Sequence, residues 1–316
     1  MNSNIFLSNL PVVIVVVIFL VIYGMAYFFK LHKKSRTSPL TRELLRSPGE
    51  SLRTEIENLT FDIVFYPMML FLFPIMIFAT YLSQIYFGVA RENSIIIGIY
   101  AFAALSFIGF CSVKLWRLLK DRNNYRLGLD CEIAVGQELN QLMLEGCRVF
   151  HDFPVEEFNK KFNIDHIVVG TEGVFSVETK GRSKRNKIGG EEGATVSYDG
   201  QKLQFPGWSE HKPIEQAKAN AKWLSEWLSK VVGENVIVHP VLALPGWYVD
   251  LKKTGDVFVF NGKNPQLMLR ARSYNSLSET LIKQISYQLE QKCRNVEPTA
   301  YRQNKKNETH APLPIF

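Results

Sequence analysis

FNIDHIVVGTEGVFSVETKG, residues 162–181, reads as two apolar strands joined by a turn at Gly170–Gly173. Three charged residues interrupt it: Asp165 on the first strand, and Glu178 and Lys180 on the second. They are interleaved with bulky aliphatic residues, so we expect both faces of this hairpin to be largely buried. Buried carboxylates need a charged partner, a metal ion or a catalytic role. The hairpin is therefore both the centre of a fold and a candidate site.

The segments around the hairpin predict a mixed α/β domain over residues 125–293, with helix, three strands, helix and strand in that order. A helix ends at Gly146, a short strand follows at 147–153, and a polar connection at 154–161 leads into the hairpin. The later elements are a polar, basic stretch at 181–212 with one short strand at 194–198, a helix at 212–230, strands at 235–244 and 256–262, and a helix at 276–292. Residues 294–316 predict a disordered tail.

The first third of the chain, residues 1–117, predicts a membrane region with three transmembrane helices, at about 10–30, 63–88 and 94–116. Residues 1–29 contain no charged side chain, and the second run contains Pro67 and Pro74. Buried core helices this apolar would need a large protein around them, so a bilayer is the better environment.

The flanking charges predict the orientation of these helices. Basic residues are concentrated in the loop at 30–60 and after residue 117, whereas the link between the second and third runs has only Arg91. By the positive-inside rule, the N-terminus lies outside, and the loop and the C-terminal domain lie in the cytoplasm. We therefore expect a multi-pass protein of the inner (plasma) membrane, with the lipid bilayer as one partner.

The overall composition narrows the function classes. The chain has 37 Lys and Arg against 30 Asp and Glu, a mild basic excess that suits nucleic acid or an anionic membrane face. Its four cysteines are scattered without a CxxC pair, which argues against a zinc ribbon and a disulfide framework. No Ser or Cys nucleophile with a His partner is readable, and the apolar runs lack the ionisable residues of a transport path.

The charged residues of the hairpin suit one chemistry in particular. Glu178 and Lys180 point to the same face of their strand, and the hairpin can bring Asp165 beside them. Two such carboxylates can share a hard divalent cation, Mg²⁺ or Mn²⁺, and a neighbouring lysine can orient or deprotonate water or stabilise developing charge. Glu132 can join them if its helix packs across the sheet. These are the functional groups that metal-assisted hydrolysis of phosphodiester bonds requires.

These residues also carry a resemblance. Asp165 followed by Glu178-Thr179-Lys180 resembles the PD-(D/E)xK signature of the restriction-endonuclease-like superfamily, and the predicted order of elements is that of its core. More narrowly, the chain resembles the NERD (nuclease-related) domain over residues 125–230. The matching segments are GLDCE at 128–132, IDHIVVG at 164–170, GVFSVETKG at 173–181 and PIEQ at 213–216.

The resemblance implies a restriction-endonuclease-like fold and roles for individual residues. Asp165 and Glu178 would be metal ligands, Lys180 the catalytic lysine, Glu132 the acid on the first helix and Gln216 a polar residue facing the site. Ile164 precedes Asp165 where the name of the superfamily has a proline, which is normal for NERD-like sequences.

Each candidate has a plainer alternative. The three hairpin charges could form a structural ion pair, Glu132 could be a solvated carboxylate in a first helical turn, and Gln216 could be simply exposed. His166 alternates to the face opposite Asp165 and is expected to be a satisfied or surface histidine. The Trp223/Trp227 pair and Trp208 could stack on bases, although packing is the more common use of a Trp pair at i, i+4.

The basic run that follows the hairpin could grip phosphate groups, or it could be a solvated loop. Its candidate nucleic-acid-binding residues are Arg182, Lys184, Arg185 and Lys187. We therefore expect a membrane-anchored, Mg²⁺- or Mn²⁺-dependent nuclease-like protein that acts on nucleic acid, with DNA favoured. The alternative is a non-catalytic module that binds nucleic acid or protein and is tethered to the membrane. Assembly into a homo-oligomer is left open.

Overall fold

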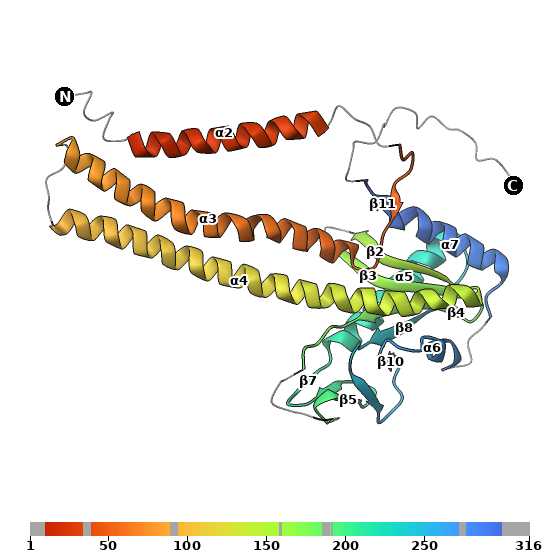
Figure 1. The fold of residues 1–316 in the computed structure, drawn as a ribbon. Coiled ribbons are helices and arrows are strands. Elements are labelled where there is room, and N and C mark those ends of the chain that lie inside the picture. Colours follow the sequence, from red (N-terminus) through yellow and green to blue (C-terminus); the bar gives the residue numbers. More distant parts are fainter. Residues whose placement is uncertain are drawn as a thin grey trace. The chain divides into compact units, whose positions relative to one another are not determined.

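The computed structural model describes residues 10–33, 39–88, 94–157, 160–184, 190, 192–271 and 276–298 (Figure 1). The chain divides into two compact units. One, which we call the helical unit, comprises Met1–Arg42, Glu57–Asn123 and Pro298–Phe316. The other, the α/β unit, comprises Glu43–Ile56 and Asn124–Glu297. The fold is mixed α/β, with sheets of two, five and four strands among the described residues.

The helical unit contains α2 (Leu10–Lys33) and most of α3 (Glu50–Tyr86) and α4 (Ser94–Asn140), whereas the start of α3 and the end of α4 belong to the α/β unit. Among the described residues, two helices are long and apolar enough to cross a membrane, and they cover the predicted runs at 63–88, as far as Tyr86, and at 94–116. A shorter apolar stretch, Val12–Met25, lies in α2. Two of the three predicted spans are therefore supported as candidates, and the first stays a prediction.

Aromatic side chains join α3 and α4 within the helical unit. The rings of Phe73 and Phe107 are stacked with centroids 3.9 Å apart. The hydroxyl of Tyr100 donates a 2.9 Å hydrogen bond to the side-chain oxygen of Gln84. Pro67 and Pro74 both lie inside α3, which continues through them.

The central sheet of the α/β unit has the strand order β10-β8-β4-β3-β2. Its strands are β2 (Arg148–Glu157), β3 (Lys160–Gly170), β4 (Gly173–Thr179), β8 (Val238–Ala243) and β10 (Phe258–Phe260). The β2–β3 and β3–β4 pairs are antiparallel, whereas the β4–β8 and β8–β10 pairs are parallel. With α4 before them and α5 (Lys212–Val232) between β4 and β8, the predicted order of elements is confirmed.

The hairpin turns where the sequence predicts, with Gly170 paired to Gly173. The polar connection that we expected at 154–161 is wrong, because β2 and β3 continue as a ladder through Val155↔Phe162 and Glu156↔Lys161. Val155 is buried between the half-buried Pro154 and the exposed Glu156, as expected for a strand with one face toward the core.

A second sheet, β7-β6-β5-β9, takes three of its four strands from the polar, basic stretch at 181–212. Its strands are β5 (Thr195–Tyr198), β6 (Leu203–Phe205), β7 (Trp208–Glu210) and β9 (Tyr248–Leu251). Only β5 was expected. The other three have four residues or fewer, too few to show a clear alternation of apolar and polar side chains.

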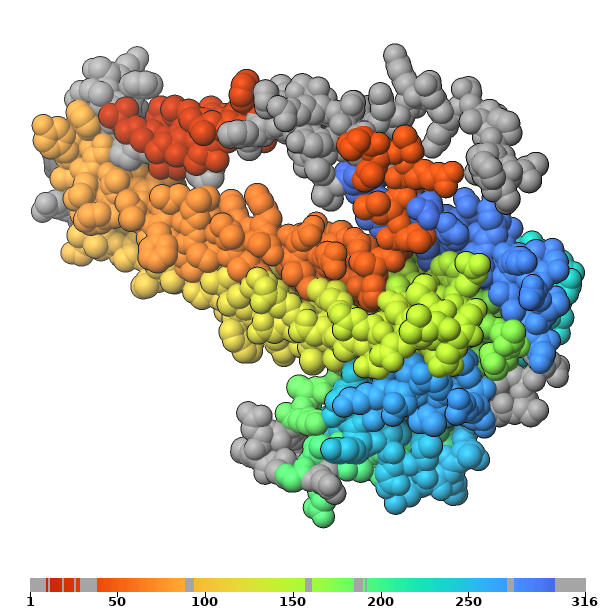
Figure 2. All heavy atoms as spheres, turned by 45° about the vertical axis from the view of Figure 1, so that its right-hand side comes forward, coloured from red at the N-terminus to blue at the C-terminus, as the bar shows by residue number. Residues whose placement is uncertain are grey.

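Residues 43–56, which we call the arm, belong to the α/β unit although they precede α4 by a long stretch of chain. The arm contains β1 (Leu44–Leu45), which pairs with β11 (Arg294–Val296), so part of the predicted tail at 294–316 is a strand. Figure 2 shows the arm, in orange, against the end of α4 and the blue C-terminal elements. Residues 299–316 lie outside the described part of the chain.

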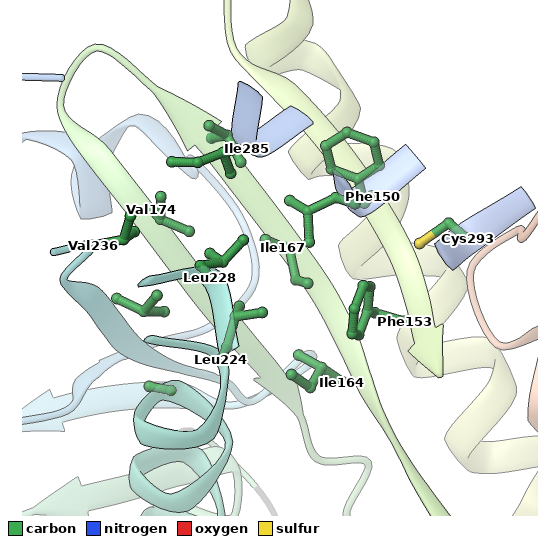
Figure 3. Packing of buried hydrophobic residues seen from close by; sticks show 14 of the residues in the cluster. Phe150, Phe153, Ile164, Ile167, Val174, Leu224, Leu228, Val236, Ile285 and Cys293 are labelled. Carbon is green, nitrogen blue, oxygen red and sulfur yellow. The ribbon is translucent and has the colours of Figure 1, made fainter. Parts of the chain in front are cut away.

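Helices cover both faces of the central sheet. One face packs against α5 and α7 (Glu279–Cys293), with Phe153, Ile167, Leu224 and Ile285 among the buried residues (Figure 3). The other face packs against the C-terminal part of α4 through a second cluster of buried residues, Val135, Leu139, Val168, Phe175 and Val177 among them. The remaining helices are α6 (Gln266–Arg270), η1 (Gln141–Glu145) and η2 (Glu192–Ala194).

The tryptophans that could have stacked on bases pack against other aromatic rings, and the cysteines form no disulfides. The stacked rings of Trp223 and Trp227 lie 6.1 Å apart and pack against the core, as the packing interpretation of this pair requires. Trp208 stacks on Phe205 at 4.7 Å. All four cysteines are free thiols, which agrees with the absence of a disulfide framework.

Candidate functional site

The structure brings Asp165, Glu178 and Lys180 together at the end of the hairpin. Oε1 of Glu178 lies 2.5 Å from Nζ of Lys180 in an ion pair. Asp165 accepts a 2.7 Å hydrogen bond from the backbone N–H of Thr179, the residue between them. Glu178 is 1% and Asp165 6% exposed, whereas the side chain of Lys180 keeps 23% of its surface accessible. Two buried carboxylates and one accessible ammonium group therefore share this corner.

Burial and mutual repulsion shift the pKa values of the three groups. Burial, then the charges of Glu178 and Glu132, raise the pKa of Asp165 well above its ordinary value. Burial also raises the pKa of Glu178, against the attraction of Lys180. For Lys180, burial favours the neutral amine, but the two carboxylates outweigh it and raise its pKa. Lys180 is thus a cation at neutral pH, which suits charge stabilisation rather than deprotonation of water.

Glu132 comes from α4, which packs across the sheet as the functional interpretation required. It is only 7% exposed, so it is not the solvated carboxylate of the alternative interpretation. Burial, then the charges of Asp152 and Glu178, raise its pKa to about 8. Its Oε2 atom is buried without a hydrogen-bond partner among the described residues. Such an atom calls for a proton, a water molecule or a cation.

The donor set suits a hard divalent cation. Asp165, Glu178 and Glu132 offer carboxylate oxygens, the ligands that Mg²⁺ prefers, and their raised pKa values show that uncompensated negative charge is unfavourable here. Within the described ranges, no group of three or more His, Cys, Asp or Glu side chains is arranged to hold a metal ion. Asp165 and Glu178 could hold such an ion only with the remaining positions filled by water or substrate, as is usual for Mg²⁺.

Asn220 is the residue on α5 that reaches the acidic cluster, and the sequence did not single it out. Its Nδ2 donates a 2.8 Å hydrogen bond to Oε2 of Glu178, and the residue is buried. Gln216, the predicted residue, lies one turn earlier on the same helix and is exposed. Gln216 is indicated by the resemblance, through the PIEQ segment at 213–216, and that segment ends before Asn220.

The described residues of the basic run, Arg182 and Lys184, make contacts within the α/β unit. Arg182 makes two hydrogen bonds to Glu210 on β7, at 2.8 and 2.9 Å. Lys184 places its ammonium group 5.7 Å from the ring centroid of Trp247, whose Nε1 donates to the backbone oxygen of Arg182. Arg185 and Lys187 lie outside the described residues. The charge of Arg182 is therefore already paired, and Lys184 is the accessible cation of the two.

His166 is a structural histidine. Its Nδ1 lies 2.9 Å from Nδ1 of His151, whose Nε2 is 3.0 Å from the side-chain oxygen of Asn140. Burial lowers the pKa of His151 to about 4, and burial and His151 hold the pKa of His166 well below its usual range. Both rings are neutral at physiological pH, so neither serves as an acid or a cation there.

Comparison with known proteins gives one finding. A protein-family model, the nuclease-related domain (NERD), matches residues 127–245, a range that includes Glu132, Asp165, Glu178, Lys180 and Asn220. The comparisons with curated proteins and with solved structures give no match. Residues 127–245, which contain the whole acidic cluster and its lysine, are therefore a nuclease-related (NERD) domain.

Proposed function

We propose that the protein is a metal-dependent nuclease that hydrolyses phosphodiester bonds, with DNA as the favoured substrate, and that its helical unit anchors it in a membrane. The observation that carries this proposal is the cluster of two buried carboxylates, Asp165 and Glu178, with the accessible Lys180, inside a NERD domain. Burying two carboxylates destabilises the fold unless a counterion or a proton compensates their charge, and such costly groups are concentrated at functional sites.

The proposed division of roles follows from the geometry. Asp165 and Glu178 hold Mg²⁺ or Mn²⁺, which when bound polarises a phosphate oxygen and lowers the pKa of a water molecule. Lys180, cationic and accessible, stabilises negative charge that develops on the phosphate. Glu132, whose pKa is raised to about 8 in the metal-free protein, is the acid of the cluster proposed to exchange a proton with substrate or water. Asn220 orients Glu178.

The architecture supports a restriction-endonuclease-like core for this domain. The observed order of helix, three antiparallel strands, helix and parallel strand is the one that the resemblance implies. The catalytic trio lies at the end of the β3–β4 hairpin, where that signature places it.

Chain connectivity supports membrane anchoring by α3 and α4. The arm at the start of α3 and the residues at the end of α4 belong to the same compact unit. If α3 and α4 both cross the bilayer, the chain returns to the side from which it left, as this arrangement requires. The basic loop and the basic exit of α4 make that side the cytoplasm, with α2 as a further span and the N-terminus outside.

The test uses the full-length protein in detergent, with labelled single- and double-stranded DNA and RNA and with Mn²⁺ or Mg²⁺. We expect metal-dependent cleavage by the wild type and a loss of at least a hundredfold for Lys180→Ala, the size typical of removing an electrostatic catalyst. Lys230→Ala, at an exposed position near the end of α5, is the matched control. Equal cleavage by the wild type and Lys180→Ala would reject the role of Lys180.

The second candidate is a binding module without catalysis, tethered to the membrane. The ion pair between Glu178 and Lys180 favours it, because it compensates buried charge without any metal ion. Thermal stability separates the two functions. A metal site gains stability as Mn²⁺ is added, by mass action, whereas a structural ion pair does not respond.

A further inference from the structure

The arm packs on the face of α4 that carries Glu132. Gly128, Glu132 and Gly136 are spaced by four residues and so share one helix face. The arm comes close to α4 at the two glycines on either side of Glu132. A Cβ atom at Gly136 would lie 2.6 Å from Cγ of Pro48, and one at Gly128 would lie 3.2 Å from Cδ1 of Leu52. A side chain at Gly136 would therefore require Pro48 to shift, whereas one at Gly128 would require only a small movement of Leu52.

A third glycine, in the arm itself, lies over Glu132. Gly49 is buried and has a φ of +69°, a backbone conformation that favours glycine. A Cβ atom here would lie 2.4 Å from Cδ1 of Leu129 and 3.5 Å from Oε2 of Glu132. This is the oxygen that has no hydrogen-bond partner among the residues described. The arm therefore closes one side of the acidic cluster.

Asp152 fastens the arm in this place. It is fully buried, and its backbone adopts a φ of +49°, which a non-glycine residue rarely does. Its Oδ2 accepts hydrogen bonds from Nε of Arg46, from the backbone N–H of Ser51 and from Oγ of Ser51, at 2.8, 2.9 and 2.8 Å. Asn163 donates to its other oxygen. One carboxylate thus pairs with the arm's arginine and caps the first turn of α3.

We infer that the arm, residues 43–56, is a wall of the active site, and that Asp152 and Gly136 are positioning residues that hold it over Glu132. The inference rests on the proposed function. It adds to the catalytic equipment a segment that lies outside the matched domain at 127–245. The arm excludes water from Glu132 and fixes the side chain's direction, so an undocked arm leaves the hairpin trio intact but the cluster incomplete.

Gly136→Ala provides the sharpest test in the full-length protein. Alanine favours a helix more than glycine does, so the helix itself gains stability, while the new methyl group pushes Pro48 and the arm away. Gly109→Ala is the matched control, since it lies in the same helix and a Cβ there meets no described atom within 4 Å. We expect Gly136→Ala to speed hydrogen exchange in the arm about tenfold or more, and Gly109→Ala to leave it unchanged.

The activity readout separates positioning from general stability. Gly136→Ala and Asp152→Ala are expected to lower kcat about tenfold or more, with KM within about twofold of wild type. Asp152→Asn, which keeps an oxygen for Ser51 and tolerates the positive φ, should recover much of the loss. Ile285→Val, in the core away from the arm, shows what destabilisation alone does.

The exchange measurement tests the docking of the arm without any cleavage assay, so failure of the inference is distinct from failure of the proposed function. Unchanged exchange in the arm for both Gly136→Ala and Asp152→Ala would overturn the inference, as would a loss of kcat no greater than that of Ile285→Val. If the wild type cleaves no substrate but both variants free the arm, the docked wall stands and the nuclease proposal falls.

Discussion

Asn220 on α5 donates a 2.8 Å hydrogen bond to Oε2 of Glu178 on β4. Lys180 approaches the other oxygen of the same carboxylate, so both oxygens of Glu178 are engaged from different elements. This arrangement fixes the direction of a fully buried acid. It also ties the first helix after the hairpin to the residue that we propose as a metal ligand.

Asn220→Ala should therefore impair both stability and cleavage. Without the amide, Oε2 of Glu178 is buried and unsatisfied, which costs about 1–3 kcal/mol of unfolding free energy. We expect cleavage to fall about tenfold through misorientation of Glu178. Chemical denaturation followed by tryptophan fluorescence and the DNA cleavage assay measure the two effects.

Gln216→Ala is the matched variant one turn away on the same helix. Because Gln216 is exposed, its loss should change the free energy of unfolding by less than about 0.5 kcal/mol. A fall in cleavage by Gln216→Ala alone would support the predicted role of Gln216 in holding substrate. Equal stability of Asn220→Ala and wild type would contradict the importance of the bond to Glu178.

Glu132 predicts an unusual pH dependence for the metal-free protein. Its pKa is raised to about 8 in the folded state from 4.5, so the unfolded chain loses this proton first as the pH rises. Stability is then lost between pH 4.5 and about 8, on the order of 1–3 kcal/mol. Glu132→Gln removes the titration and should make the metal-free protein more stable than wild type at pH 8.

Mn²⁺ should reverse this trend in the wild type. A divalent cation favours the ionised carboxylates, so its stabilising effect is expected to grow as the pH rises from 6 to 8. Thermal unfolding at several pH values, with and without Mn²⁺, measures both parts. A metal-free wild type whose stability rises over this range in parallel with Glu132→Gln would disprove the assignment of this titration to Glu132.

The sequence alone predicts the hairpin and its charges because the relevant information is local. Asp165 and Thr179, which the structure joins by a hydrogen bond, are 14 residues apart, and a Gly-containing turn fixes their register. The apolar stripe of α5 is likewise a local pattern with helical period, and its residues Ile214, Ala217, Ala221, Leu224 and Leu228 are buried as expected.

The arm could not be predicted in the same way. Arg46 and Asp152 are 106 residues apart, and nothing in the sequence around either indicates the other. A basic loop between apolar runs is normally read as a topology signal, so Arg46 was counted with the other basic residues rather than as the partner of a buried acid. Asn220 is not predicted for a different reason, because the family resemblance on this helix covers only residues 213–216 and a lone Asn in an amphipathic helix carries no signal of its own.

His151 predicts a pH dependence opposite to that of Glu132. Its pKa falls from 6.5 to about 4 on folding. Between these two pH values His151 is therefore protonated in the unfolded chain and neutral in the folded protein. Stability is therefore lost as the pH falls from 6.5 to about 4, by about 2 kcal/mol at pH 5. His151→Gln, which can keep a polar contact to Asn140, should weaken this acid sensitivity. Denaturation at pH 5 and pH 7.5 checks it, and equal pH slopes in both proteins would contradict it.

Removal of residues 1–39, which contain α2, tests how the protein is anchored. Because α3 and α4 are each long and apolar enough to cross a bilayer, the shortened chain should remain in the membrane fraction after alkaline extraction. Its arm is intact, so protease digestion of right-side-out and inverted vesicles should still place residues 43–56 and the NERD domain on the same side. Full-length protein is the control for both measurements. Release of the shortened chain into the soluble fraction, or cleavage of the arm and the domain from opposite sides, would contradict anchoring by a pair of spans.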